Sequence, residues 1–457
     1  MGLKFREIGD KLKDSIRRMR KEKAPEKEKA ESVKAPRLSD EAYALLEKLF
    51  SELGPRPAAS MESRNAARKI AGIFNTFTDD VTVTTGRIIP GLLRWMTLSL
   101  VVFSSLVFIF SVFGLPYIAI AAGVFFVISS INELGMKKNP LRSFFPTDDA
   151  ANVHCVIDPE GEVERTIIFS AHHDTAEMKE ETGDGILSRL NLQTGVLSFI
   201  GLNLVVVIQI IVELLQGRLF AAGLAPWPIL ILLLIMFSLI VLSLYRNLKA
   251  GESFTSGAGD NLSGVAVIST LGKYFASEKK QGRGCRSTRL VFVSFDGEEC
   301  GAEGSSIWYR DNSHILVNPV NLNFDGLYSP SELALLSSDG NGFVSLSSSL
   351  ASRCSMLSSG MGYSIRVGKI GWFGGCTDAV SAAVNGIKAT TMTSMADGKE
   401  GISHTAEDTP DKVSPEALSI AMSVAIKLVD DAERKDENDG ASASLLDNGR
   451  KYRLSRY

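Results

Sequence analysis

Two adjacent carboxylates, Glu298 and Glu299, follow an apolar run over residues 290–295 that is rich in β-branched and aromatic side chains. The run predicts a buried strand, and the Asp-Gly turn after it puts both carboxylates at the carboxyl edge of a sheet, where open α/β sheets bind ligands. Adjacent carboxylates repel each other unless a positive charge lies beside them. A metal ion would supply that charge, with one carboxylate as ligand and the other as base. The pair is also compatible with a solvated turn, so its meaning depends on the rest of the chain.

Four further residues of metal-binding type stand at the ends of predicted strands or in the loops after them. His172 follows the apolar run TIIFSA, and Asp174 can hold its other ring nitrogen. Asp260 precedes a predicted helix, Asp325 follows the run VNLNF, and His404 lies in a polar loop. Singly, they also fit a strand-edge histidine, a helix N-cap, a turn residue and an exposed histidine. Together with the carboxylate pair they predict one cluster, whose oxygen and nitrogen ligands suit two zinc ions, while manganese or cobalt fit the same set.

The elements around these residues alternate between strands and helices. Strands are predicted at 81–84, 152–157, 166–171, 288–295, 321–324, 332–336, 363–367 and 387–392, and helices at 40–53, 60–77, 261–277, 305–311, 342–358, 378–384 and 415–432. Such alternation predicts an α/β fold, a three-layer αβα sandwich with a mostly parallel central sheet.

Long apolar runs interrupt this pattern twice. The run 95–131 has no charged residue over 37 positions and is broken only by Gly-Leu-Pro. A second pair of runs covers about 190–212 and 219–245. Because about 20 apolar residues cross a bilayer as one helix, these runs predict four transmembrane helices, inserted as two hairpins. A partner is therefore the lipid bilayer, and the short connections leave room for a homodimer.

Charge and cysteine usage indicate the compartment. Five widely spaced cysteines without a CxxC motif favour reduced thiols in the cytosol. The net charge of −3 gives no reason to expect nucleic acid as a partner. Basic residues flank the hairpins on one side, at 87, 94, 137, 138, 142, 189, 246 and 249, against only 218 in the turns. The positive-inside rule then predicts a multi-pass plasma-membrane protein with the soluble domain and both termini in the cytoplasm.

With these residues in this order, the chain resembles the di-zinc aminopeptidase family of bacterial leucyl aminopeptidases, glutamate carboxypeptidases and glutaminyl cyclases. The matching motifs, in family order, are AHHD at 171–174, GDNLSGVA at 259–266, FDGEECGAEGS at 295–305, NFDG at 323–326 and SHTAEDT at 403–409. The resemblance implies that Asp260 bridges two zinc ions, that Glu299 and His404 complete one site, and that His172 and Asp325 complete the other. It also implies that Asp174 orients His172 and that Glu298 is the general base. The segment at 377–379 departs from the family, because it lacks the histidine that often follows the aspartate there.

The expected organisation is a basic arm over 1–37, a zinc exopeptidase domain assembled from 38–88, 134–188 and 249–432, hairpins over 89–133 and 189–248, and a mobile tail over 433–457. The basic arm fits either an amphipathic helix on an anionic membrane or a solvated helix. The resemblance implies a membrane-anchored aminopeptidase that hydrolyses the N-terminal residues of peptides. The alternatives are a non-catalytic receptor or scaffold relative, a carboxypeptidase or other amide hydrolase, and a glutaminyl-cyclase-like enzyme.

Overall fold

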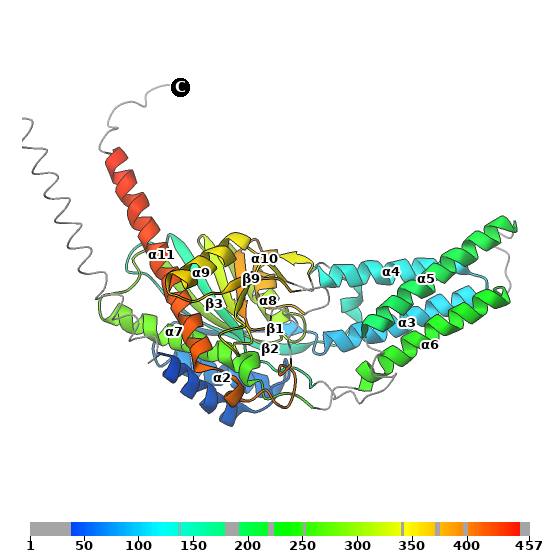
Figure 1. The fold of residues 1–457 in the computed structure, drawn as a ribbon, viewed down its shortest axis with the longest axis horizontal. Coiled ribbons are helices and arrows are strands. Elements are labelled where there is room, and N and C mark those ends of the chain that lie inside the picture. The colour runs from blue at the N-terminus through cyan, green and yellow to red at the C-terminus, as the bar shows by residue number, and fades with distance from the viewer. Residues whose placement is uncertain are drawn as a thin grey trace, which may run out of the picture.

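The structure is a computed structural model that describes residues 38–135, 137, 139–178, 192–217, 224–249, 253–339, 342–370, 375–395 and 401–447. The predicted basic arm over 1–37 and the end of the predicted tail, 448–457, lie outside these residues. Figure 1 shows a sheet-centred domain from one end of which two pairs of long helices project.

The central sheet has eight strands in the order β1-β2-β4-β3-β5-β10-β6-β9. These are β1 Val81–Ile88, β2 Asp148–Ile157, β3 Arg165–His172, β4 Thr288–Phe295, β5 Pro319–Phe324, β6 Ala334–Leu336, β9 Arg366–Gly368 and β10 Lys388–Thr393. The middle strands β4, β3, β5 and β10 pair in parallel, whereas β1, β2 and β6 join antiparallel to their inner neighbours. The predicted mostly parallel sheet is thereby confirmed.

Helices cover both faces of the sheet. One face carries the helix over 38–53, α2 Met61–Phe74, α7 Ser263–Lys280, α9 Ser348–Gly360 and α11 Pro415–Asp447, and the other carries α8 Glu303–Asn312 and α10 Ala379–Val384. The period of two in β3 explains the two layers, since Ile167 and Phe169 pack under the first group and Ile168 under the second. The three-layer αβα sandwich is therefore confirmed.

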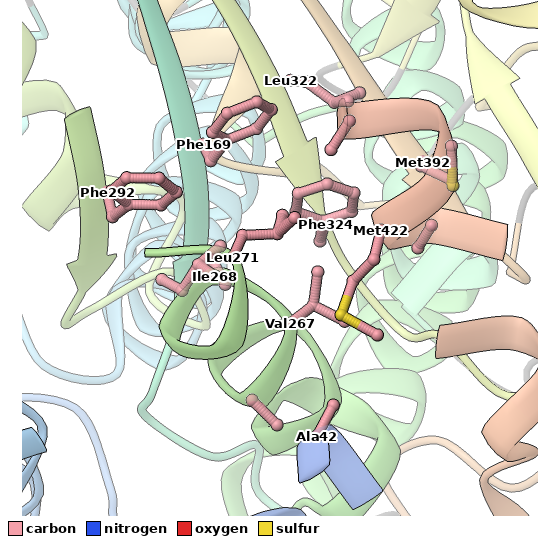
Figure 2. Close-up of a cluster of buried hydrophobic side chains, with 14 of the residues drawn as sticks. Ala42, Phe169, Val267, Ile268, Leu271, Phe292, Leu322, Phe324, Met392 and Met422 are labelled. Carbon is pink, nitrogen blue, oxygen red and sulfur yellow. The ribbon is translucent and has the colours of Figure 1, made fainter. Parts of the chain in front are cut away.

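The core beneath α7 fixes the strands that end at the candidate site. Phe169 of β3 stacks on Phe292 of β4 and on Phe324 of β5, with ring centroids 5.5 and 6.2 Å apart (Figure 2). Ile268 and Leu271 of α7 belong to the same cluster and are fully buried. Each such side chain contributes about 1.5–3 kcal/mol on burial. The three strands therefore present their carboxyl ends as one rigid edge.

Four helices are long and apolar enough to cross a membrane: α3 Leu92–Val112, α4 Pro116–Leu134, α5 Leu192–Leu215 and α6 Trp227–Lys249. They pack on one another through a buried apolar cluster of their own. Their outer faces are apolar and exposed, as at Val102, Leu204 and Leu234. Inside the bundle, the Gln209 side chain donates to the Ser111 carbonyl and to the Glu213 carboxylate at 3.0 and 2.9 Å. Such a bundle, apolar outside and with the Gln209 side chain hydrogen-bonded inside, suits a lipid environment.

The structure differs from the sequence prediction mainly at helix ends. Helix α9 begins at Ser348 and not at 342, because the Ser347 hydroxyl accepts the backbone N–H of Leu350 and caps it there. Helix α11 continues to Asp447, although the prediction ended it at 432. The added segment is polar but has no proline, so its composition does not stop the helix.

Candidate functional site

Each predicted metal ligand is delivered by a different element of the fold. His172 is the last residue of β3, while Glu299 and Asp325 follow the ends of β4 and β5. Asp260 lies in the η3 segment Ala258–Leu262 before α7, and His404 lies in the loop at 401–409. Because β3, β4 and β5 run parallel, their ends meet at one edge.

Asp260 is the centre of the cluster. Its Oδ1 atom lies 3.2 Å from His172 Nε2, and its Oδ2 atom lies 3.2 Å from His404 Nε2. Asp325 Oδ1 approaches the same nitrogen of His172 at 3.5 Å, and Glu299 Oε2 approaches His404 Nε2 at 3.5 Å. One carboxylate is thus shared by two groups of three, each of which offers ligand atoms within 4.8 Å of one another.

Glu298 stands beside this pair of groups. Its Oε2 atom lies 3.8 Å from His172 Nε2, and its side chain is 8% exposed. It also forms, with His172 and Glu299, a third group of residues whose ligand atoms lie within 4.8 Å of one another. The two carboxylates at the end of β4 therefore both reach the cluster.

The residues fit divalent metal ions. His172 Nε2, Asp325 Oδ1 and Glu299 Oε1 are buried and make no hydrogen bond within the described part of the chain. Burial raises the pKa of Glu298 well above its usual range and that of Glu299 to about 8, although the charges of His172 and His404 oppose the rise. A cation would supply the missing partner for each of these atoms and would lower both pKa values. Imidazole and carboxylate ligands without thiolate suit zinc, and they also accept manganese or cobalt.

Asp174 connects the end of β3 to the turn after β4. Its two carboxylate oxygens accept the backbone N–H groups of Glu298 and Glu299 at 3.2 and 3.1 Å. Its Oδ1 atom also lies 3.4 Å from His172 Nδ1. One buried carboxylate therefore fixes the imidazole and the backbone that carries both glutamates. The adjacent His173 points elsewhere, with its Nδ1 atom 2.9 Å from the Ser294 hydroxyl.

Asp408 and Ser403 hold Asp260 in place. Asp408 accepts the backbone N–H of Gly259 at 2.7 Å and that of Asp260 at 3.2 Å. The Ser403 hydroxyl donates to Asp260 Oδ2 at 2.7 Å. Sequence reasoning quoted both residues within the SHTAEDT motif but assigned them no role. Two buried side chains, through three hydrogen bonds, thus fix the residue whose carboxylate the two histidines share.

Arg56 is a third residue whose role the sequence did not reveal. Its guanidinium is fully buried and donates to the carbonyls of His173 at 2.7 Å, of Ser256 at 2.9 Å and of Gly54. Burial lowers its pKa to about 10, so it stays charged at neutral pH, and the nearby carboxylates of the site oppose the lowering. The position lies between the helices predicted at 40–53 and 60–77, and no role was predicted for it. The signal that was available is the arginine itself, between two prolines in a turn.

Asp378 is a further buried carboxylate near the cluster. Neither of its oxygens makes a hydrogen bond to the described residues, and its side chain is inaccessible to solvent. Burial raises its pKa to about 7, with His172 opposing and Asp325 reinforcing the rise. The sequence marked this position only through the missing histidine after it.

Comparison with known proteins agrees with this arrangement. Residues 243–429 match the sequence model of peptidase family M28. Among solved structures, a leucine aminopeptidase precursor from Bacteroides thetaiotaomicron is similar, with a TM-score of 0.51 and 12% identity over 86% of this chain and 96% of that chain. A glutaminyl cyclase of the same organism, bound to N-acetylhistamine, has a TM-score of 0.50 and 12% identity over 86% of this chain and 97% of that one. The Porphyromonas gingivalis glutaminyl cyclase has a TM-score of 0.50 and 14% identity over 86% and 98%.

At these identities the structural matches establish the fold, which is that of zinc exopeptidases. The family match covers the segment that supplies Asp260, Glu298, Glu299, Asp325 and His404, while His172 precedes it. The resemblance inferred from the sequence is confirmed by this match, in which residues 243–429 are similar to peptidase family M28.

Proposed function

We propose that this protein is a membrane-anchored, two-zinc aminopeptidase that removes N-terminal residues from peptides. The observation that supports this most is the position of Asp260, one oxygen of which faces His172 and the other His404, each at 3.2 Å. In the proposal, His172 and Asp325 hold one ion, Glu299 and His404 hold the other, and Asp260 serves both. Zinc in such a site supplies Lewis-acid chemistry, because it polarises a peptide carbonyl and activates water near neutral pH.

The chain's own residues divide the remaining work. Glu298 accepts a proton from the attacking water and returns it to the leaving amine, as a general base and then a general acid. Its burial and its position beside His172 keep it near the reacting atoms and away from bulk water. Asp174 orients the imidazole of His172 and, through the two backbone N–H groups, the turn that carries Glu298 and Glu299.

The proposal is favoured over its alternatives by particular residues. A single-zinc glutaminyl cyclase would make little use of both His172 and Asp325, which lie together at Asp260. A receptor or scaffold relative has no need of Glu298, yet this carboxylate is present and buried beside the cluster. Carboxypeptidase action differs only in how the pocket holds the peptide's end, so the choice between them rests on the experiment below.

We also propose that segments 38–88, 134–188 and 249–432 form the peptidase domain, and that this domain and both termini lie in the cytoplasm. The support is the excess of lysine and arginine on the domain side of the helix pairs. Each pair returns the chain to the side from which it left, so the three segments can assemble into one domain.

The test combines metal analysis with a substrate panel. The purified protein is assayed for bound zinc and for turnover of aminoacyl, N-blocked, C-blocked and N-terminal glutaminyl peptides. We expect about two zinc ions per chain and hydrolysis that requires a free amino terminus. Glu298→Gln should keep the metals and lose about 10²–10⁴-fold in rate, whereas Glu416→Gln, at an exposed position of α11, should behave as wild type.

Each assignment has its own contrary result. Two metals without hydrolysis of any peptide would contradict the enzyme, and full activity in Glu298→Gln would contradict the base. Cyclisation of the glutaminyl peptide in place of hydrolysis would establish the cyclase alternative.

A further inference from the structure

Both helix pairs leave the domain at the sheet edge that carries the candidate metal site. Ile88 at the end of β1 and Asp148 at the start of β2 are cross-strand partners, and the first helix pair lies between them. Because β2 runs antiparallel to β4, this end of the ladder lies at the carboxyl end of β4. The second pair leaves just beyond β3, where Glu177 pairs with Phe254 across the insertion. The carboxyl ends of the strands therefore face α3–α6 (Figure 1).

The first residue of α8, Glu303, follows the turn after β4 and is bonded to both ends of the first helix pair. The backbone N–H of Ile89, just before α3, donates to Glu303 Oε2 at 2.7 Å. The other oxygen of Glu303 forms an ion pair with Arg142, which also bonds to Glu133 at the end of α4 at 3.1 Å. Glu303 is 5% exposed, so the link is inside the protein. The segment that carries the two glutamates is thus fixed to the helices and not merely near them.

The distance from the site to the first helix pair is short. The backbone N–H of Gly91 donates to Cys300 Sγ at 3.3 Å. A Cβ atom placed on Gly301 would lie 3.4 Å from the side chain of Leu92, the first residue of α3. Glu299 precedes Gly301 by two residues, which span at most about 7 Å in extended chain. Together with the short contact at Gly301, this places Glu299 on the order of 10 Å from the start of α3.

Aromatic residues mark where the bilayer would begin on this side. Trp95, in the first turn of α3, stacks on Phe145 with ring centroids 5.9 Å apart. The adjacent Phe144 is 80% exposed and Leu93 is 65% exposed, and the side chain of Arg142 on the same segment as Phe144 is 34% exposed. Aromatic and basic side chains collect at membrane–water interfaces. The interface therefore lies against the edge of the sheet that holds the metal-ligand cluster.

The most exposed of the proposed ligands is His404, which lies in the loop at 401–409. The side chain of His404 is 31% exposed, whereas that of His172 is inaccessible. The loop of His404 is fixed to Gly259 through Asp408, and Gly259 follows the last residue of α6, Lys249, by ten positions. The cluster is therefore open to solvent at His404, at the same carboxyl edge of the sheet from which both helix pairs leave.

Resting on the proposed aminopeptidase function, we propose that the substrate is the amino terminus of a polypeptide whose apolar segment is held in the same membrane. A peptide free in solution gains nothing from an enzyme whose site faces the bilayer at this distance. A membrane-held peptide is confined to a thin layer that includes the site, which raises its effective concentration. Short extended termini reach that layer, since about three to five residues span 10–15 Å.

The test is a series of anchored peptides in proteoliposomes of phosphatidylcholine with the wild-type protein. All peptides share one N-terminal tetrapeptide, followed by polar spacers of roughly 0, 5, 10, 20 and 40 residues and one transmembrane helix. The comparison is the tetrapeptide with its spacer alone, at the same bulk concentration. Glu298→Gln gives the background rate, and detergent micelles that separate enzyme from peptide remove the confinement.

We expect the anchored peptide to be cleaved at least about tenfold faster than the soluble one, with a maximum near the spacer of about five residues and a decline at longer spacers. The preference should vanish in dilute micelles. Equal rates for anchored and soluble peptides, or rates that rise steadily to the longest spacer, would overturn the inference and leave the aminopeptidase intact. If no peptide of either form is cleaved by the zinc-loaded protein, the proposed function itself falls.

Discussion

Replacement of Arg56 by methionine is expected to destabilise the peptidase domain, because Arg56 connects the segments that carry the candidate metal site. The guanidinium donates to three backbone carbonyls that belong to three separate segments, those of Gly54, His173 and Ser256. Methionine fills a similar volume but leaves these carbonyls without a donor. It also removes the positive charge that lies within electrostatic reach of Asp174, Asp408 and Asp260. Breaking a buried charge network by removing one partner costs about 3–5 kcal/mol.

The loss can be read from thermal unfolding of the metal-free protein in detergent, monitored by intrinsic fluorescence. At about 2–4 °C per kcal/mol for domains of 150–250 residues, the expected decrease in Tm is about 6–20 °C. Arg56→Lys keeps the charge but loses the planar guanidinium that donates several hydrogen bonds, so its Tm should lie between those of the wild type and Arg56→Met. Arg310→Met is the matched control, because the Arg310 side chain is 66% exposed and pairs with its sequence neighbour Asp311.

The reasoning would be refuted if Arg56→Met and Arg310→Met unfolded at the same temperature. A second readout separates folding from metal binding. In Arg56→Met the affinity for zinc, measured against a chelator, should fall by about 10–100-fold, because groups that orient the ligands contribute to binding. Unchanged zinc affinity together with a lower Tm would mean that Arg56 supports the fold and not the ligand geometry.

Three further predictions concern other parts of the molecule. Gly259→Ala should lower Tm by several degrees and weaken zinc binding, because the added Cβ would lie 1.9 Å from the ring of Tyr328. The control is Gly72→Ala, at an exposed helix position with open space around it, which should raise stability by up to about 1 kcal/mol. Burial lowers the pKa of His154 below that of an unfolded histidine. As the pH drops below about 6.5 the unfolded state therefore takes up a proton before the folded state does, and stability falls. His154→Gln should make the urea midpoint of the metal-free protein less dependent on pH between about 6.5 and 5, and an unchanged pH dependence would contradict this. The proposed topology can be tested with an impermeant maleimide added outside intact cells. A cysteine introduced at Gln216, in the turn after α5, should react, whereas one introduced at Asp411 in the peptidase domain should not. The reverse pattern would place the domain outside the cell.

The sequence was sufficient for those parts of the site that lie directly after predicted strands. His172, Glu299 and Asp325 follow apolar runs, and the rule that parallel strands end at one edge brings them together without further information. Arg56 and Asp408 could not be found this way. Their partners are backbone carbonyls and N–H groups, at separations of 117 residues for Arg56 and His173 and 149 for Asp408 and Gly259. Backbone groups are the same at every position, so no residue pattern marks them.

The fold shows the same division between local and non-local information. The alternation of apolar runs with helical patterns located the strands of the sheet, and the length of the uncharged apolar runs located the four long helices. The start of α9 depended on one serine hydroxyl at position 347, and several neighbouring serines offer the same group. The end of α11 depended on helix propensity in a polar segment, which is a weak signal without packing.

The two insertions leave the sheet intact because each is a loop on an antiparallel ladder. Ile88 and Asp148 are cross-strand partners, so the first helix pair occupies the place of a β-hairpin turn between β1 and β2. At the second insertion the N–H of Met178 donates to the Ser253 carbonyl at 2.9 Å, and Glu177 pairs with Phe254. An insertion between two paired strands must have its first and last residues about 5 Å apart, which is the distance between neighbouring strands. Two antiparallel helices that are joined at their far end satisfy that condition. Because both insertions leave from the carboxyl edge of the sheet, the geometry that lets the domain close around them also places the metal-ligand cluster at the edge from which the four apolar helices project.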